Sequence, residues 1–399
     1  MSVSRGTIGR IGLLTTLYFA QGLPFGIFMQ ALPVIMRREG QSLEAIGLTN
    51  LLALPWVLKF LWAPAIDRIA GPRRRVIIPL NLAAAGLLLA LALVSPGSLV
   101  PLLVTVFLCN LVAATQDIAT DGLAVESLPA EERGLGNGVQ VAGYRLGMVL
   151  GGGVLVQLFD AWGWFTSFAS AAAAIVLVTA PLVLLPASPR PPVGDRKTSL
   201  QALRWDRWFA GPGGPAWFGL LVVYKLGDSL GTSMVKPMLV DQGLTLGEIG
   251  GLMGVWGSVA GLAGALLGGF LVSSGGRRRA LLAFALLQLP TLAAYGWIAH
   301  AGPDLLVPVV IAEHLVSGMA TAALFAAMMD ACRPGHAGSD YTVQASVVVM
   351  AQGLAATFSG YSAATLGYEG HFALAVALAL VPIFVVSRMA RGDVRFRLA

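Results

Sequence analysis

The chain has 399 residues, of which 56% are hydrophobic and only 12% are charged, against about 25% charged residues in soluble domains. This composition excludes a soluble enzyme or a soluble binding module. The 26 Lys and Arg residues exceed the 20 Asp and Glu residues, but they lie in short loops between apolar runs, so we expect no nucleic acid partner. Cys109 lies in a predicted helix and Cys332 in a predicted loop, so we expect no disulfide.

Apolar runs long enough to cross a bilayer follow one another along the whole chain. Each span requires about 20 mostly apolar residues, and twelve runs meet this condition. The first run continues too far for a cleaved signal peptide, so we expect it to remain as a span. The sequence therefore predicts an all-α membrane protein with twelve transmembrane helices. They are expected at 8–36, 44–66, 76–95, 99–124, 135–159, 163–186, 213–238, 247–272, 280–299, 303–329, 339–364 and 369–390.

The longest polar interruption, 187–210, divides the spans into two sets of six. It carries the sequence SPRPPVGDRKTS, whose Pro and charge content is typical of a linker. The loops of the two sets repeat, because GQSLEAIG (40–47) resembles GLTLGEIG (243–250) and GPRRR (71–75) resembles GGRRR (275–279). We therefore predict an N-terminal half at 1–186, a cytoplasmic linker at 187–210 and a pseudo-symmetric C-terminal half at 211–399, an arrangement known among transporters.

The distribution of Lys and Arg predicts how the spans are oriented. If both termini are cytoplasmic, most basic residues lie in cytoplasmic loops, and Arg37 and Arg38 alone lie in outer loops. This asymmetry follows the positive-inside rule. We therefore predict a multi-pass protein with both termini in the cytoplasm.

The first two spans carry polar residues at membrane depth. Gln21, Gly22 and Pro24 are expected to interrupt span one, because Pro removes a backbone hydrogen bond there. Lys59 lies past the midplane of span two. It can act as a cavity cation for an anionic substrate or as the partner of a buried acid, and both interpretations stay open.

Spans four and five bring charged residues to a similar depth. Asp117 and Asp121 stand one helical turn apart and therefore share a face. Arg145 enters from span five, and we expect a mainly structural role for it. Because ionised groups in a bilayer must pair or face water, we expect Asp117, Asp121, Arg145 and Lys59 to form one polar network that can take part in proton coupling.

The second half carries its own buried charges. Lys225 and Asp228 in span seven can neutralise each other, either as a structural pair or as an ion or substrate site. Glu313, near the middle of span ten, has no basic residue within a turn, and His314 points about 100° away from it. A lone carboxyl at that depth can carry a proton or be hydrogen-bonded and inert.

The remaining polar side chains within spans complete the expected substrate site. Glutamine and tyrosine side chains from spans one, five, seven and eleven can hydrogen-bond a solute in a central cavity. The full set of expected substrate-binding residues is Gln21, Gln30, Lys59, Gln140, Tyr144, Tyr224, Lys225 and Gln352.

The loop after span two reads APAIDRIAGPRRR. It resembles the Gly-x-x-x-Asp-Arg-x-Gly-Arg-Arg signature of the major facilitator superfamily, with Ala63 in place of the leading glycine and a shifted spacing to Gly71. The resemblance implies a conformational lock in which Asp67 acts with Arg68, although a basic loop also arises from topology alone. Leu271 stands where the second half would repeat Asp67, so the second lock is expected to lack its acid.

Longer stretches resemble the AmpG-like permease branch of that superfamily. These are YFAQGLPFG (18–26), LPWVLKFLWAPAIDR (54–68) and ATQDIATDG (114–122). The branch includes muropeptide permeases, acetyl-CoA transporters and compact siderophore importers of the pyochelin and rhizobactin kind. The element SDYTVQAS (339–346) and the twelve-span length resemble the siderophore group most. The resemblance implies import of a small solute across a bacterial inner membrane.

We therefore expect a proton-coupled siderophore importer, with a muropeptide or an acetyl-CoA-like solute as alternative substrates. A membrane-embedded enzyme or a sensor is the alternative of another class. GRIG and GLGNG lack the Lys-Ser/Thr of a phosphate-binding loop, and the four His residues have no metal-ligand spacing. We expect no catalytic residue, metal or other cofactor, and the expected partners are the solute, protons and membrane lipids. The chain is expected to act as a monomer.

Overall fold

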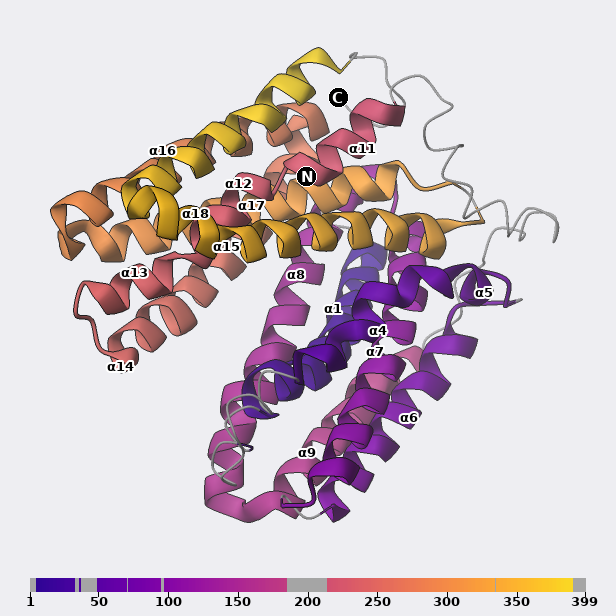
Figure 1. Ribbon diagram of the computed structural model, residues 1–399. Coiled ribbons are helices and arrows are strands. Elements are labelled where there is room, and N and C mark those ends of the chain that lie inside the picture. Colours follow the sequence, from indigo (N-terminus) through magenta and orange to yellow (C-terminus); the bar gives the residue numbers. More distant parts are fainter. Residues whose placement is uncertain are drawn as a thin grey trace. The chain divides into compact units, whose positions relative to one another are not determined.

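The computed structural model describes residues 5–32, 36, 49–69, 71–94, 97–184, 214–333 and 335–389. These residues form helices, turns and bends, with no strand among them (Figure 1). The all-α prediction is confirmed. The predicted linker, the loop with Arg37 and Arg38, the GQSLEAIG stretch and the side chain of Gln30 lie outside what the structure describes.

Among the described residues, nine helices are long and apolar enough to cross a membrane. The last of them, α18 (Ala337–Arg388), bends at Gly367, where φ is +69°, and contains predicted spans eleven and twelve. A φ in that region favours glycine, which lacks the Cβ that would clash. Predicted spans two and seven are not among the nine because short turns interrupt their helices. The described helices are therefore consistent with twelve spans.

Predicted span two consists of short helices joined by tight turns. Pro55 and Pro64 each stand near the start of an α-helical segment, where a missing N–H group costs little. Lys59 therefore lies on a 3₁₀ turn between two α-helices rather than within a continuous helix. The segments are η2 (Thr49–Ala53), α4 (Leu54–Leu58), η3 (Lys59–Leu61) and α5 (Ala63–Asp67).

Predicted span seven is interrupted in the same way. Its segments are α11 (Gly214–Val223), α12 (Leu226–Ser233) and α13 (Val235–Asp241). Tyr224 and Lys225 form the turn between α11 and α12. In both broken spans the buried lysine therefore lies at the interruption, where freed backbone groups and a charged side chain come together.

The chain divides into two compact units. Unit 1 comprises Met1–Leu128, Ala142–Leu203 and Cys332–Thr342, and unit 2 comprises Pro129–Val141, Arg204–Ala331 and Val343–Ala399. Each unit thus contains the beginning of a helix whose remainder belongs to the other unit. Helix α18 begins in unit 1, and α8 (Arg133–Val149) begins in unit 2.

In unit 1, α6 packs against α7 and α9, and α1 packs against both of these (Figure 1, indigo to magenta). Their shared core contains Leu23, Phe28, Leu88 and Phe168, each at most 3% exposed. Close van der Waals packing of such side chains holds helices together in a bilayer, where lipid is as apolar as they are. The bounds are α1 (Arg5–Gly26), α6 (Arg74–Leu93), α7 (Leu99–Ser127) and α9 (Leu155–Leu184).

The expected interruption of span one at Gln21–Pro24 is wrong in its position. Helix α1 continues through Pro24 to Gly26 and then widens into the π turn η1 (Ile27–Ala31). Proline cannot donate the hydrogen bond of a regular helical turn, and a π turn is one way in which a helix accommodates such a gap. The irregular backbone therefore follows the proline rather than coinciding with it.

Glycines let α1 approach α8 and the π turn η5 (Leu150–Val154) at backbone distance. A Cβ atom at Gly22 would lie 2.0 Å from the carbonyl oxygen of Tyr144, and one at Gly151 would lie 2.0 Å from that of Leu23. Any larger residue at either position would push the two helices apart. Small residues at helix interfaces are typical of membrane proteins.

In unit 2, α17 packs against α15 and α16. Met238, Tyr295 and Phe372 contribute to a core in which each is fully buried. Large apolar side chains such as Phe270 and Leu287 are exposed instead, as expected for surfaces that face lipid. The remaining bounds are η4 (Ala130–Glu132), α14 (Leu246–Ile249), η7 (Gly250–Trp256), α15 (Gly257–Gly275), α16 (Arg277–Ala301), η8 (Pro303–Leu305) and α17 (Leu306–Asp330).

Candidate functional site

A buried ion pair lies in the interior of unit 1. Nζ of Lys59, on the η3 turn, pairs with Oδ2 of Asp117 in the middle of α7, and their side chains are only 8% and 9% exposed. One turn further along α7, Oδ1 of Asp121 accepts a hydrogen bond of 2.9 Å from the Tyr18 hydroxyl. The structure thus places Lys59 against Asp117 as expected. An interaction of Arg145 with this cluster stays a prediction.

Three aromatic rings lie beside this pair. The ring of Phe25 lies 5.3 Å from that of Trp56 and 5.6 Å from that of Tyr144, centroid to centroid. The Trp56 indole N–H donates to Oδ1 of Asn110 at 3.0 Å, and Nζ of Lys59 lies 5.5 Å from the Trp56 ring. All three rings are partly exposed. Sequence reasoning missed Phe25 and Trp56, although Phe25 stands one turn after Gln21 on the same helix.

The predicted glutamines differ in their surroundings. Gln21 in α1 is 1% exposed, and neither its amide nitrogen nor its amide oxygen has a hydrogen-bond partner among the described residues. Gln140 is buried and Gln352 is half-buried, and both belong to unit 2. The buried amide of Gln21 therefore keeps both its donor and its acceptor capacity for a ligand.

A second buried cluster lies in unit 2 around the interruption of span seven. Nζ of Lys225 lies 2.5 Å from Oδ2 of Asp228, so the predicted i,i+3 contact is present. The Ser317 hydroxyl accepts from Lys225 at 2.9 Å and donates to Asp228 at 3.1 Å. The nearby Tyr224 is 2% exposed, and its hydroxyl donates to the carbonyl of Leu281 at 3.0 Å. Ser317 was missed, although it stands one turn after Glu313 in α17.

Glu313 is not the lone carboxyl that the sequence predicts. Nδ1 of His314 lies 2.7 Å from its Oε2, and their side chains are 20% and 4% exposed. Adjacent residues leave a helix in different directions, but the imidazole folds back along α17 far enough to reach the carboxylate. Gly257 leaves room for this ring, because a Cβ atom there would lie 2.6 Å from Nε2 of His314.

A charged cluster surrounds the first turn of α18 in unit 1. Nη2 of Arg73 lies 2.6 Å from Oδ1 of Asp67 and 2.7 Å from Oε1 of Glu126. The other oxygen of Asp67 accepts from the backbone N–H of Ser339 at 2.7 Å and from its hydroxyl at 2.5 Å. Burial alone would lower the pKa of Arg73, but the two carboxylates raise it overall. Arg68, the other residue of the predicted lock, is exposed.

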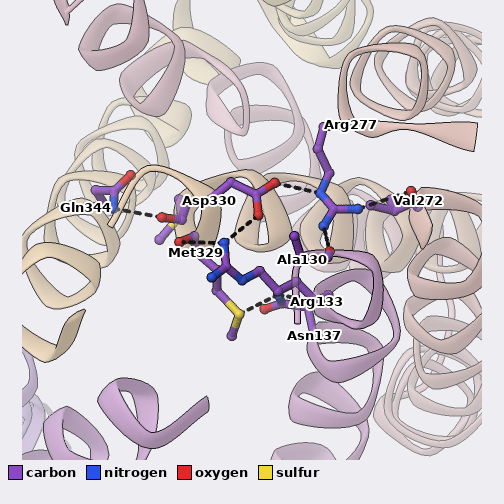
Figure 2. Close-up of polar contacts among 9 residues, drawn as sticks. Ala130, Arg133, Asn137, Val272, Arg277, Met329, Asp330 and Gln344 are labelled. Carbon is purple, nitrogen blue, oxygen red and sulfur yellow. Dashed lines mark hydrogen bonds and ion pairs between the residues drawn. The ribbon is translucent and has the colours of Figure 1, made fainter. Parts of the chain in front are cut away.

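Unit 2 contains a corresponding cluster at the start of α8 (Figure 2). Oδ2 of Asp330 accepts from Nε of Arg277 at 2.8 Å, and Oδ1 accepts from Nη1 of Arg133 at 2.8 Å. Arg277 also donates to the carbonyl of Ala130. Leu271 stands where the other half has Asp67, so the loop of this half has no such acid, as expected. The acid of this cluster is Asp330 of α17, which sequence reasoning missed.

The Major Facilitator Superfamily profile matches residues 14–359. The anhydromuropeptide permease of Escherichia coli (strain K12) is 31% identical over 402 residues, which cover 97% of this chain and 81% of the permease. A protein of Rickettsia conorii named putative transporter AmpG 4 is 24% identical, with 92% of each chain covered.

Solved structures agree with this family in fold. The transporter FucP, in its outward conformation, superposes with a TM-score of 0.69 at 16% identity, covering 96% of this chain and 99% of FucP. The proton:xylose symporter XylE superposes with a TM-score of 0.68 at 13% identity, covering 95% of each chain. Together with the profile match and the permease of Escherichia coli, these likenesses show that the chain belongs to the Major Facilitator Superfamily and is a multi-pass membrane transporter.

Proposed function

We propose that this transporter imports anhydromuropeptides across a bacterial inner membrane, driven by protons. The 31% identity to the anhydromuropeptide permease, over nearly the whole chain, supports this class of solute. The observation that carries the proposal is the interior of unit 1, where an unpartnered glutamine amide stands one helical turn before Phe25, whose ring packs against Trp56 and Tyr144. Such a surface suits sugar rings, which bring hydroxyl groups and apolar faces together.

The element that favoured a siderophore makes contacts within the chain instead. In SDYTVQAS (339–346), Ser339 binds Asp67, and both oxygens of Asp340 accept from Arg333 at 2.6–2.9 Å. The amide of Gln344 donates to the carbonyl of Met328. These contacts account for Ser339, Asp340 and Gln344 without a ligand, whereas the buried hydroxyl groups of Thr342 and Ser346 have no hydrogen-bond partner among the described residues. Because of these contacts and the 31% identity to the permease, we favour an anhydromuropeptide over a siderophore or an acetyl-CoA-like solute.

Glu313 is the proposed carrier of the coupling proton. Its side chain is 4% exposed and contacts His314, the neighbouring group that can accept or return a proton. One turn away, Ser317 joins the pair of Lys225 and Asp228, so several exchangeable groups lie along one stretch of α17. Proton coupling requires a titratable group, whereas solute binding requires only the cavity. Asp117 and Asp121 are the alternative carriers in unit 1.

Uptake into proteoliposomes tests the transport proposal. An inward proton gradient should drive accumulation of a radiolabelled anhydromuropeptide, and a protonophore should reduce it to background. Glu313→Gln should abolish accumulation while equilibrium binding persists. Full uptake by Glu313→Gln would move the coupling to another acid. Accumulation of a ferric siderophore without anhydromuropeptide would overturn the substrate, and binding without uptake of any solute would favour a sensor.

Asp67 is proposed to act as a conformational lock through the first turn of α18. Its carboxylate holds the N–H group and the hydroxyl of Ser339, where the positive end of the helix dipole attracts an anion. Gly338 permits this approach, because a Cβ atom there would lie 2.8 Å from Oδ1 of Asp67. Release of this contact would free the start of a helix that continues into unit 2.

A further inference from the structure

We infer that Gln21, Phe25, Trp56 and Tyr144 form a subsite for a neutral pyranose ring within unit 1. This inference rests on the proposed function and specifies which part of the solute these residues bind. Gln21 binds two adjacent hydroxyl groups of the sugar, and the aromatic rings contact its apolar face.

Gln21 provides the polar half of the subsite. Buried polar side-chain atoms are usually hydrogen-bonded, and an unpaired one costs free energy. Both amide atoms of Gln21 are unpaired among the described residues although the side chain is 1% exposed. A carboxamide in this state can donate to one hydroxyl group while it accepts from the next. A ligand with adjacent hydroxyl groups thus satisfies both atoms at once.

The aromatic cluster provides the apolar half. Phe25 stands one turn after Gln21 on α1, so its ring and the amide share one helix face. The three ring centroids lie 5.3–6.4 Å apart. The hydrogen bond to Asn110 fixes the orientation of the Trp56 indole, and Nζ of Lys59 lies over its ring at 5.5 Å, so a sugar would pack on the remaining exposed surface of the three rings. A fixed, partly exposed ring offers a flat surface on which the C–H groups of a sugar can pack.

The charge at this place favours a neutral group over an anion. Lys59 lies 5.5 Å from the Trp56 ring, but its ammonium group is already paired with Asp117. An entering carboxylate would have to compete with that buried partner, whereas a sugar would leave the pair intact. The subsite therefore takes a sugar ring and not the acidic peptide of the solute.

A second aromatic cluster in unit 1 provides a contrast. Trp164 lies between Phe159 and Phe168, and its indole N–H donates to the carbonyl of Leu91. Phe159 and Trp164 are half-buried, as the rings of the proposed subsite are, and Phe168 is 1% exposed. The contrast is that no side-chain amide with unpaired atoms belongs to this cluster among the described residues. Trp164→Phe is accordingly the matched control for Trp56→Phe.

Equilibrium binding to the full chain in nanodiscs tests the subsite. The probes are the peptide-free disaccharide N-acetylglucosaminyl-1,6-anhydro-N-acetylmuramic acid, the complete anhydromuropeptide and the sugar-free peptide. We expect Gln21→Leu to weaken disaccharide binding on the order of 10- to 100-fold, because two hydrogen bonds are lost. Trp56→Phe should weaken it about 10-fold, through a smaller ring that Asn110 no longer orients. Two control variants should bind the disaccharide as the unchanged protein does. They are Trp164→Phe and Gln288→Leu, the second of which changes a buried glutamine of α16 whose amide nitrogen has no partner among the described residues.

Thermal stability separates a binding role from a structural one. If Gln21 serves a ligand, Gln21→Leu should unfold at the same or a higher temperature without ligand, because leucine removes an unpaired buried amide. A lower unfolding temperature would assign Gln21 a structural role, and Trp56→Phe would then decide the subsite. The subsite would be overturned if both variants bound the disaccharide with unchanged affinity. It would also be overturned if the protein bound the complete anhydromuropeptide but not the disaccharide. Neither result would contradict the proposed function. Failure of the unchanged protein to bind any probe would overturn the proposed function together with it.

Discussion

The two charged clusters at the starts of α18 and α8 contain acidic and basic residues in opposite proportions. In unit 1, one base, Arg73, lies between two acids, Asp67 and Glu126. In unit 2, one acid, Asp330, lies between two bases, Arg277 and Arg133. Arg73 and Arg277 have the same separation in the sequence as Glu126 and Asp330. The arginine and the acid of the neighbouring helix therefore correspond, and the third member differs in sign.

This difference follows from how each cluster holds its helix. The Asp67 carboxylate accepts the N–H group of Ser339 directly, so unit 1 needs an acid at this place. In unit 2 the Ser273 hydroxyl accepts the N–H group of Leu135, and Arg133, from the first turn of α8, reaches Asp330. Both arrangements hold the start of a helix that continues into the other unit. They differ in that Arg73 contacts two carboxylates, whereas Arg277 and Arg133 both contact the carboxylate of Asp330.

The largest effect is expected where one acid serves two bases. Asp330→Asn should leave Arg277, whose side chain is 2% exposed, without a carboxylate and should lower stability by about 3–5 kcal/mol. The measurement is thermal unfolding in detergent, with Asp304→Asn, which changes an exposed acid of η8, as the control. An unfolding temperature equal to that of the unchanged protein would show that Asp330 is not the essential acid of this cluster.

A smaller effect is expected for the corresponding acid of unit 1. Asp67→Asn should cost about 1.5–3 kcal/mol, the range for hydrogen bonds to a charged group, because Arg73 keeps Glu126 while Ser339 loses its anionic acceptor. Its unfolding temperature should lie between those of Asp330→Asn and the unchanged protein, and uptake should also fall if the lock is required. Glu131→Gln, at an exposed acid of η4, is the control. If Asp67→Asn lost more stability than Asp330→Asn, the expected order of the two effects would be wrong.

The sequence predicted those features that depend on local spacing. Hydropathy located the spans, and the i,i+3 relation placed Lys225 beside Asp228. The sequence analysis missed Asp330. It compared the loop that contains Asp67 with its counterpart in the other half, but the residue that corresponds to Asp330 is Glu126, which lies in α7. It also failed for His314, whose contact with Glu313 depends on the side-chain conformation rather than on the helical angle between the two residues.

The unpaired state of Gln21 is a property that no sequence pattern could reveal. It depends on every neighbour that α1 meets, including the backbone of α8, which approaches because Gly22 has no side chain. The position of the irregular turn after Pro24 likewise depends on packing around η1. Residue types at membrane depth could thus be selected from the sequence, whereas their free or occupied hydrogen-bonding capacity required the three-dimensional arrangement.

The smallest effect is expected where unit 2 uses a hydroxyl group in place of a carboxylate. Ser273→Ala removes the acceptor of the Leu135 N–H group, a contact of 3.1 Å between neutral partners, and should cost about 0.5–1.5 kcal/mol. Amide hydrogen exchange should be faster at the start of α8 and unchanged at the start of α18, because the anionic contact of Asp67 is intact. Ser274→Ala is the matched control, since the Ser274 hydroxyl is exposed and donates only to carbonyls of its own helix. Equal acceleration of exchange at both helix starts would show that the two clusters do not act separately. The difference in charge between them would then not explain how each helix start is held.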